Sequence, residues 1–201
     1  MSIYRPALVA AALAAMQLAA SAQPSLTATA TPGATVVGST GTVNVSVDVS
    51  DPMTLWGATM NLYWDPRLSF DGVSATIFGQ SLDQFVTHFD PSQTQITTDP
   101  DPSMPGLSHY SVSLAVDLGA DPSTFASLPA GTATMTFSFT GLAAGTQPVH
   151  LDLQLTDDSF NSPSVSVDSS VAVSAVPEAP PAAMLAAGLG VLAWLSRRRR
   201  S

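Results

Sequence analysis

The alternation of apolar and polar residues is the feature that most constrains the fold of this chain. In GTVNVSVDVS every second residue is valine from Val43 to Val49, and the residues between them are polar. The same period of two recurs in LWGATMNLYW, SHYSVSLAVD, GTATMTFSFT, PVHLDLQLTD and SVSVDSSVAVS. Because successive side chains of a strand point to opposite faces, each stretch predicts a strand with one buried face, and SVSVDSSVAVS predicts a last pair of short strands. One-sided burial is typical of antiparallel sheets, whereas parallel sheets bury both faces.

Turn signals separate these stretches. Asp-Pro pairs occur at 51–52, 65–66, 90–91 and 121–122, and DPDPSMPG fills positions 99–106. Aspartate hydrogen-bonds its own turn, and proline fixes φ while lacking a donor for a strand ladder. Eight or nine short strands in about 150 residues, with no long helical period, predict a β-sandwich. For IFGQSLDQFVTHFD, residues 77–90, we expect a turn of helix or an irregular crossing between the sheets.

The N-terminus predicts export. Arg5 precedes an apolar run from Ala7 to Ala20, and the small residues Ala20 and Ala22 stand just before Gln23. This pattern is typical of a secretory signal peptide cleaved after residue 22. The alternative is a buried alanine-rich helix. We interpret residues 1–22 as the signal peptide and residues 23–175 as the folded body.

The body carries a strong negative charge. Its only fixed positive charge is Arg67, against fourteen aspartates and no glutamate. Such a surface repels phosphates, which argues against a nucleic-acid partner. The chain has no cysteine, so the stability of the body must come from a conventional core rather than from the disulfides that export permits.

The C-terminus is built differently. Four of the six basic residues are Arg197, Arg198, Arg199 and Arg200, and they follow an apolar or glycine stretch over 182–195. These fourteen residues would span about 21 Å as a helix, less than the roughly 30 Å hydrocarbon core. We expect a short transmembrane helix over 182–196 and a basic cytoplasmic tail over 197–201, with the body outside. A span this short suits a temporary anchor.

This tail resembles a known sorting signal. The stretch Val176-Pro177-Glu178-Ala179-Pro180, then the apolar run, then the arginine cluster, is similar to the PEP-CTERM signal of exported proteins of Gram-negative bacteria. The resemblance implies a sorting motif and linker over 176–181. It also implies that the chain is exported through the secretion translocon, is anchored transiently in the inner membrane and is then cleaved near the motif by an exosortase. The family has Pro-Glu-Pro where this chain has Pro177-Glu178-Ala179, with proline displaced to Pro180. The alternative is a plain C-terminal anchor with a basic stop-transfer cluster.

Two stretches of the body resemble cohesin modules. One runs from Val37-Gly38 through the valine strand to LWGATMNLYWDPRLSFDGVS, with its Tyr63-Trp64-Asp65-Pro66-x-Leu68 element. The other is GTATMTFSFTGLAAGTQPVHLDLQLTDDSFNSPSVSVDSSVAV. The resemblance covers most of residues 36–174. It implies an all-β, antiparallel jelly-roll β-sandwich related to carbohydrate-binding modules, flanked here by a signal-peptide helix and a short transmembrane helix. Cellulosomal cohesins bind dockerin modules, so the resemblance also makes a protein or polysaccharide partner a candidate.

The sequence offers no catalytic motif. His88, His109 and His150 are isolated, and the chain has no G-x-S-x-G, no H-E-x-x-H, no cysteine and no lysine. His150 stands between Val149 and Leu151, so we expect it on the polar face of its strand. We predict that the protein is not an enzyme.

Calcium is the one cofactor for which the sequence offers candidates. Asp157, Asp158 and Asn161, together with Ser159, form an oxygen-rich turn of the kind that calcium prefers. Asp99 and Asp101 form a second acidic cluster. Neither has the spacing of an EF-hand loop, and the alternative, aspartates that hydrogen-bond their own turns, is the interpretation we favour.

Aromatic residues supply the candidate binding site. Trp56 and Trp64 alternate in phase with Leu62 and are therefore expected in the core. Tyr63 and Asn61 fall on the opposite face, where an exposed tyrosine could stack on a glycan, contact a partner protein or simply lie on the sheet. We thus predict an exported cell-surface or extracellular-matrix protein that is a non-catalytic structural or binding module. The alternatives are a carbohydrate- or protein-binding adhesion module and a secreted hydrolase.

Overall fold

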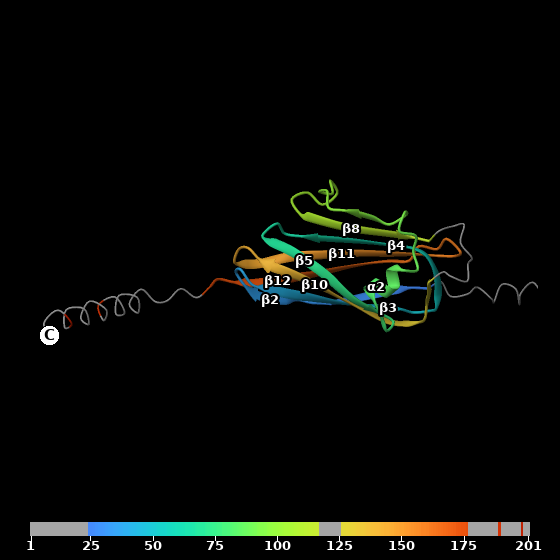
Figure 1. Cartoon of the computed structure of the whole chain (residues 1–201), viewed down its shortest axis with the longest axis horizontal. Coiled ribbons are helices and arrows are strands. Elements are labelled where there is room, and N and C mark those ends of the chain that lie inside the picture. The colour runs from blue at the N-terminus through green and yellow to red at the C-terminus, as the bar shows by residue number, and fades with distance from the viewer. Residues whose placement is uncertain (1–23, 117–125, 177–188, 190–197, 199–201) are drawn as a thin grey trace, which may run out of the picture.

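The structure is a computed structural model that describes residues 24–116 and 126–176, with Leu189 and Arg198. The signal peptide with its cleavage site, the sorting motif from Pro177 onward and nearly all of the C-terminal tail lie outside these residues. Figure 1 shows the described body as an elongated stack of strands. Within the described part of the chain, no helix has the length and apolar character needed to cross a membrane.

Two sheets form the body and confirm the predicted β-sandwich. Sheet A contains, in spatial order, β1 (Leu26–Thr31), β3 (Thr40–Val49), β10 (Gly131–Gly141), β5 (Leu68–Ile77) and β6 (Gln80–Ser81). Sheet B contains β2 (Gly33–Val36), β12 (Ser164–Ser174), β11 (Gly145–Asp157), β4 (Met53–Trp64), β8 (Ser108–Ala115) and β7 (Gln95–Thr97), and β9 (Ala126–Leu128) also pairs with β4. The pairs are antiparallel except β2 with β12, which is parallel.

The first strand passes from one sheet to the other. β1 pairs with β3 in sheet A, and after Pro32 the chain continues as β2 beside β12 in sheet B. Proline cannot donate to a ladder, so it marks the change of partner. Gly33 is required at this crossing, because a Cβ there would lie 2.4 Å from the carbonyl oxygen of Thr42. One strand therefore closes the same edge of both sheets.

The predicted alternation places the core correctly. Val43, Val45, Val47 and Val49 are buried, as are the inward residues of β10 and most of those of β11. In β4 a β-bulge changes the phase: Leu55 pairs with Asp157, yet Gly57 pairs with the adjacent Thr156. Trp56 is the extra residue of this bulge. It is half-buried and packs edge-on against Phe160, with ring centroids 4.8 Å apart. Trp64, beyond the bulge, is buried in the core as predicted.

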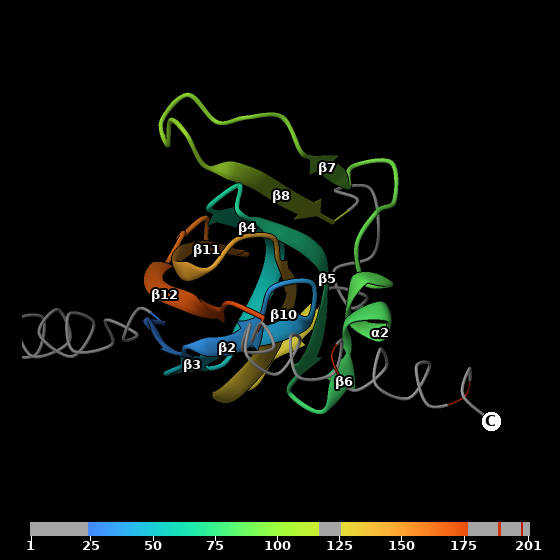
Figure 2. The same cartoon turned by 90° about the vertical axis from the view of Figure 1, so that its left-hand side faces the viewer.

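The stretch over residues 77–90 contains the one helix among the labelled elements, α2 (Leu82–Val86). Ser81 accepts the backbone N–H of Gln84, and the Gln84 side chain accepts the N–H of Ser81, which completes a capping box. Figure 2 shows α2 and β6 beside β5 at the edge of sheet A, and β7 and β8 at the edge of sheet B. The helix therefore lies where the two sheets have open edges.

Asp-Pro turns behave as the sequence predicts. Asp65 accepts the backbone N–H of Arg67 at 2.8 Å, and Asp90 accepts that of Ser92 at 2.8 Å. These are side-chain turns that span two residues. The Arg67 guanidinium also binds both oxygens of Asp65, at 2.9 and 2.8 Å, and these bonds hold the pKa of that carboxyl below its usual value.

The chain enters and leaves the sandwich at opposite ends. Leu26 pairs with Val49 at the end that carries α2, which we call the hollow end. Val36 pairs with Ser174 near Trp64 and Leu68 at the other end, which we call the aromatic end. The last described strand, β12, thus ends at the aromatic end.

Candidate functional site

Tyr63 and Asn61 lie on the outer face of sheet B, as the alternation predicts. Across the sheet, Tyr63 is opposite His109 on one neighbouring strand and His150 on the other. The prediction that Tyr63 is exposed is wrong, because only 4% of the residue is accessible to solvent. The loop before β8 covers it: the Tyr63 hydroxyl donates to Asp101 at 2.8 Å, and the His109 ring stacks on its ring at 4.8 Å.

The covering loop is fastened by several hydrogen bonds. Burial, and then the bond to the Asp101 carboxylate, raise the pKa of Tyr63 to about 12. The Asp101 carboxylate accepts the backbone N–H of Ser103 at 2.8 Å, and this bond is the largest of the interactions that lower the pKa of Asp101. His109 Nδ1 is 2.9 Å from the carbonyl oxygen of Asp99, which can only accept, so this nitrogen donates. Asp99 and Asp101 thus hold the loop over Tyr63. A glycan could stack on Tyr63 only if the face of its ring were exposed, and the loop covers it.

Asn61 is part of the same network. Its Oδ1 lies 3.4 Å from Nε2 of His109, and its residue is half-buried. It also borders a shallow polar hollow of about 220 Å³ on this face, lined as well by Thr59, Asp152, Leu153, Gln154, Ser164, Val165 and Ser166. Asn61 therefore remains accessible from the hollow even though Tyr63 is covered.

His150 lies between two carboxylates on this face. Its Nδ1 is 2.7 Å from Asp168 and its Nε2 is 3.0 Å from Asp152. Burial lowers the pKa of His150, but the hydrogen bonds and charges of the two aspartates outweigh it and raise the pKa above its ordinary value. The nearby Ser166 hydroxyl donates to Asp152 rather than to the imidazole. A serine nucleophile needs that bond to the histidine, so this cluster lacks the geometry of a catalytic triad.

The turn considered as a calcium candidate is closed by its own hydrogen bonds. Asp157 is buried, and its carboxylate accepts the backbone N–H groups of Ser159 and Asn161, at 2.9 and 2.7 Å, and the Asn161 amide at 2.8 Å. Asp158 is exposed beside it. In the described ranges, no three His, Cys, Asp or Glu side chains gather as a metal-binding group. The arrangement corresponds to the turn-forming interpretation.

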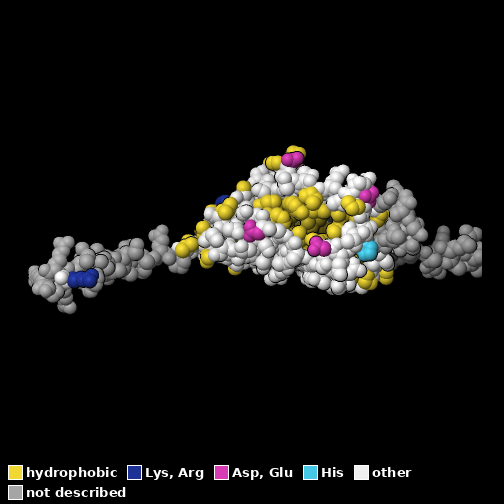
Figure 3. Space-filling model, viewed as in Figure 1, with side chains coloured by type: hydrophobic (Ala, Val, Ile, Leu, Met, Phe, Trp, Pro, Cys, Tyr) yellow, Lys and Arg dark blue, Asp and Glu magenta, His cyan; other side chains and the backbone are white. Residues whose placement is uncertain are grey.

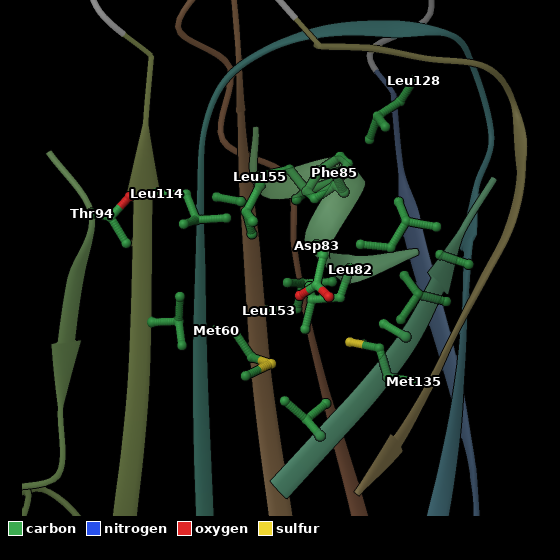
Figure 4. A pocket seen from close by; sticks show the side chains of 18 of the residues that line it. Met60, Leu82, Asp83, Phe85, Thr94, Leu114, Leu128, Met135, Leu153 and Leu155 are labelled. Carbon is green, nitrogen blue, oxygen red and sulfur yellow. The ribbon is translucent and has the colours of Figure 1, made fainter. Parts of the chain in front are cut away.

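Sequence reasoning missed an apolar cleft of about 650 Å³ that lies between the sheets at the hollow end. Figure 3 shows apolar side chains gathered in a hollow of the surface. Sheet A contributes residues of β3, β5 and β10, sheet B contributes residues of β4, β8 and β11, and the segment from Phe78 to Ile96 borders the opening. In Figure 4 Met60 and Met135 point toward each other from opposite sheets.

Small residues on the inner faces explain the cleft. Ala58, Ala75 and Ala133 line it, from β4, β5 and β10. At the aromatic end, the inward positions of β10 carry Phe137 and Phe139, both fully buried. The three alanines were the available sequence signal, but each stands on a different strand and the sequence alone does not bring them together.

No protein-family model matches the sequence, and no curated protein matches it. Among solved structures, the chain is similar to a cohesin in a cohesin–dockerin complex of Clostridium thermocellum, with 12% identity over 74% of this chain and 99% of that chain and a TM-score of 0.49. It is also similar to ACE19, the collagen-binding subdomain of an Enterococcus faecalis surface protein, with 11% identity over 75% and 98% and a TM-score of 0.41. A third similar structure is AvmM, which catalyses macrocyclization in alchivemycin A biosynthesis, with 13% identity over 77% and 91% and a TM-score of 0.43.

These structures are β-sandwiches of different function: a binding module, an adhesin subdomain and an enzyme. At TM-scores below 0.5, the similarity carries no inference about ligand or activity. Function must therefore follow from the sites of this chain.

Proposed function

We propose that this protein is an exported, non-catalytic β-sandwich binding module with a cohesin-like jelly-roll fold, displayed at the cell surface or in the extracellular matrix. The observation that carries the proposal is the apolar cleft at the hollow end. The cleft has a volume of about 650 Å³, and Asp83 is the single charged residue among its described lining residues. Such a surface can bind, but it offers no acid, base and nucleophile in reach of one another.

The direction of the chain supports display. The last strand ends at the aromatic end, and only Ala175 separates Ser174 from the sorting motif that begins at Val176. A body held by its C-terminal tail would therefore turn the aromatic end toward the membrane and leave the cleft, which opens on the long side of the body (Figure 3), accessible from outside. An exosortase would then cut near Pro177–Pro180 and discard the arginine cluster.

The polar cluster around His150 supports a non-catalytic role. Its two aspartates and Ser166 bond within the cluster, and Tyr63 is covered by a loop. A glycan platform at Tyr63 is therefore not part of the proposal.

The test is the intact mass of the protein recovered from its native host, with peptide mapping of both ends. We expect a chain that begins at Gln23 and ends between Pro177 and Pro180. The variant Glu178→Ala, which changes the sorting motif, should retain the tail. The control variant Asp158→Ala, which removes one carboxylate from the body, should be processed normally. Recovery of the wild-type chain with Arg197–Arg200 still attached would overturn processing and indicate a lasting anchor.

A further inference from the structure

We infer that the apolar cleft at the hollow end is a binding site for one small apolar molecule that is neutral or positively charged. The inference rests on the proposed function and deepens it, because it gives the displayed module a ligand class. The size of the cleft is the first argument. Protein interiors are normally close-packed, with few voids larger than a water molecule. A cleft of about 650 Å³ instead falls within the range of roughly 300–1,000 Å³ that small-molecule sites occupy.

The lining is the second argument. The side chains of its described members are apolar, apart from Asp83, Thr94 and Tyr110, which carry polar groups. Of these three, Thr94 already donates to the carbonyl oxygen of Asp90 at 3.2 Å. A molecule seated there would exchange water for apolar contact over most of its surface, which favours an apolar ligand.

The rim is the third argument. Phe78 and Gly79 form the two-residue turn between β5 and β6, with φ of 49° and 84°. Both values are positive, as a type I′ turn requires, and such a turn favours asparagine or glycine rather than phenylalanine. The sequence nevertheless places an aromatic ring here, where it lines the cleft. Unfavourable backbone angles of this kind are typically kept where the side chain has a task.

Charge decides the kind of ligand. Asp83 is exposed at the mouth and is the single charged residue in the described lining. The surrounding body carries fourteen aspartates and one arginine. A ligand with an anionic head, such as a fatty acid, would meet repulsion on entry, whereas a neutral head would not. A cationic head would gain from Asp83 and from the aromatic rings of Phe78 and Tyr110 at the cleft.

The experiment uses residues 23–176. This segment contains both sheets and every residue of the described hydrophobic core. The segment is titrated with the neutral fluorophore N-phenyl-1-naphthylamine and, in parallel, with the anionic fluorophore 1-anilinonaphthalene-8-sulfonate. We expect saturable binding of one neutral probe per chain, at least about tenfold tighter than binding of the anionic probe. Weak, non-saturating fluorescence with the neutral probe, or binding of the anionic probe as tight as that of the neutral one, would overturn the inference.

Two variants locate the binding. Ala75→Trp fills the cleft and should weaken binding of the neutral probe at least about tenfold. Ala172→Trp makes the same change at an exposed position of β12 outside the lining, and it should leave binding unchanged. Equal effects of the two variants would overturn the inference. If Ala75→Trp does not fold, the variant Asp83→Lys, at an exposed position, still tests the inference. This change should reduce the preference for the neutral over the anionic probe severalfold. An unchanged preference would contradict the charge argument.

Other occupants give different results. A second copy in the cleft would appear as a dimer by light scattering that Ala75→Trp converts to monomer, with no probe bound by the wild type. The chain's own C-terminal segment would appear as probe binding to residues 23–176 but not to residues 23–201. Either result overturns the inference. Neither affects the proposed export and processing, which the intact mass decides separately.

Discussion

The two ends of the sandwich are built from the same strands but are filled differently. At the aromatic end, the rings of Trp64, Phe70 and Phe139 lie with centroids 5.3 to 6.2 Å apart, and the Trp64 indole donates to the carbonyl oxygen of Leu68 at 3.2 Å. At the hollow end, alanines and methionines on the same strands leave the cleft of about 650 Å³. The alternation of apolar and polar residues is alike at both ends.

The difference shows that pattern and filling are separate properties. Alternation decides which face of a strand is buried, and it requires only that the inward residue be apolar. Side-chain volume decides whether the buried space is filled. In β10 the inward residues grow from Ala133 through Met135 to Phe137 and Phe139. One strand thus serves a packed core at one end and a binding cleft at the other.

The largest expected effect is the loss of an aromatic-end residue. Phe139→Ala removes a fully buried ring and should lower the free energy of unfolding by about 3–5 kcal/mol. The matched hollow-end change Ile77→Ala affects a half-buried residue that borders the cleft, and should cost about 1–2 kcal/mol. Urea unfolding measures both. Equal losses would mean that the two ends are packed alike.

The turn at the tip of the hollow end is expected to depend on polar bonds. Asp157→Ala leaves three N–H donors without their carboxylate and should cost about 2–3 kcal/mol. The exposed neighbour is the control, since Asp158→Ala should change stability by less than about 0.5 kcal/mol. Because the Asp157 oxygens already accept these donors, neither calcium nor EDTA should shift Tm in thermal unfolding. A clear rise of Tm with calcium would restore the metal interpretation of this turn.

Filling the cleft should have the opposite sign from filling the aromatic end. Ala75→Leu adds apolar atoms to open space and should stabilise the protein by about 1 kcal/mol. Val43→Leu adds a methylene beside fully buried neighbours and should destabilise it by about 1–3 kcal/mol. Denaturant midpoints of the two variants are compared with the wild type. Destabilisation by Ala75→Leu would contradict the description of the cleft as unfilled.

A smaller effect is expected where the loop covers Tyr63. Tyr63→Phe removes the donor to Asp101 and should cost about 1 kcal/mol. In a double-mutant cycle, Asp101→Asn should cost less in the Tyr63→Phe background than in the wild type, because the bond is already lost. Thermal or urea unfolding of the four proteins gives the coupling. Purely additive losses would show that the loop does not rest on this bond.

The smallest effect is a dependence of stability on pH that comes from the outer face of sheet B. The folded state raises the pKa of His150 above its ordinary value, so the protonated histidine stabilises the folded state at a pH below the ordinary pKa of about 6.5. This contribution is lost as the pH rises through the folded pKa. The variant His150→Gln should therefore show a smaller fall of Tm between about pH 6 and pH 8 than the wild type. An identical fall in both proteins would exclude His150 as its source.

The strands were predictable because their signal is local. The valines of β3 and the inward residues of β10 needed only the period of two, and the Asp-Pro turns needed only neighbouring residues. The bulge at Trp56 was not predictable in this way. Leu55 and Gly57 pair with adjacent residues of β11, so that Trp56 is an extra residue in β4. A bulge is a property of a pair of strands, and a single strand carries no sign of it.

The candidate site was less predictable than the fold. The outward direction of Tyr63 and Asn61 followed from alternation, but the burial of Tyr63 depends on Asp101, which lies 38 positions away along the chain. The prolines around Asp101 indicated a turn without indicating what the turn would cover. The calcium candidates were found for their residue types, yet the direction of the Asp157 carboxylate toward N–H groups is decided by the folded turn.

By itself the sequence determined the two-sheet architecture, the buried face of each strand and the acidic charge of the body, because these depend on residue type and on spacing along the chain. The tertiary structure alone decided that Tyr63 is covered and that Ala58, Ala75 and Ala133 face one cleft. Those properties depend on which strands become neighbours and how far their sheets separate. Distances between residues that are remote in sequence are set only when the chain is packed.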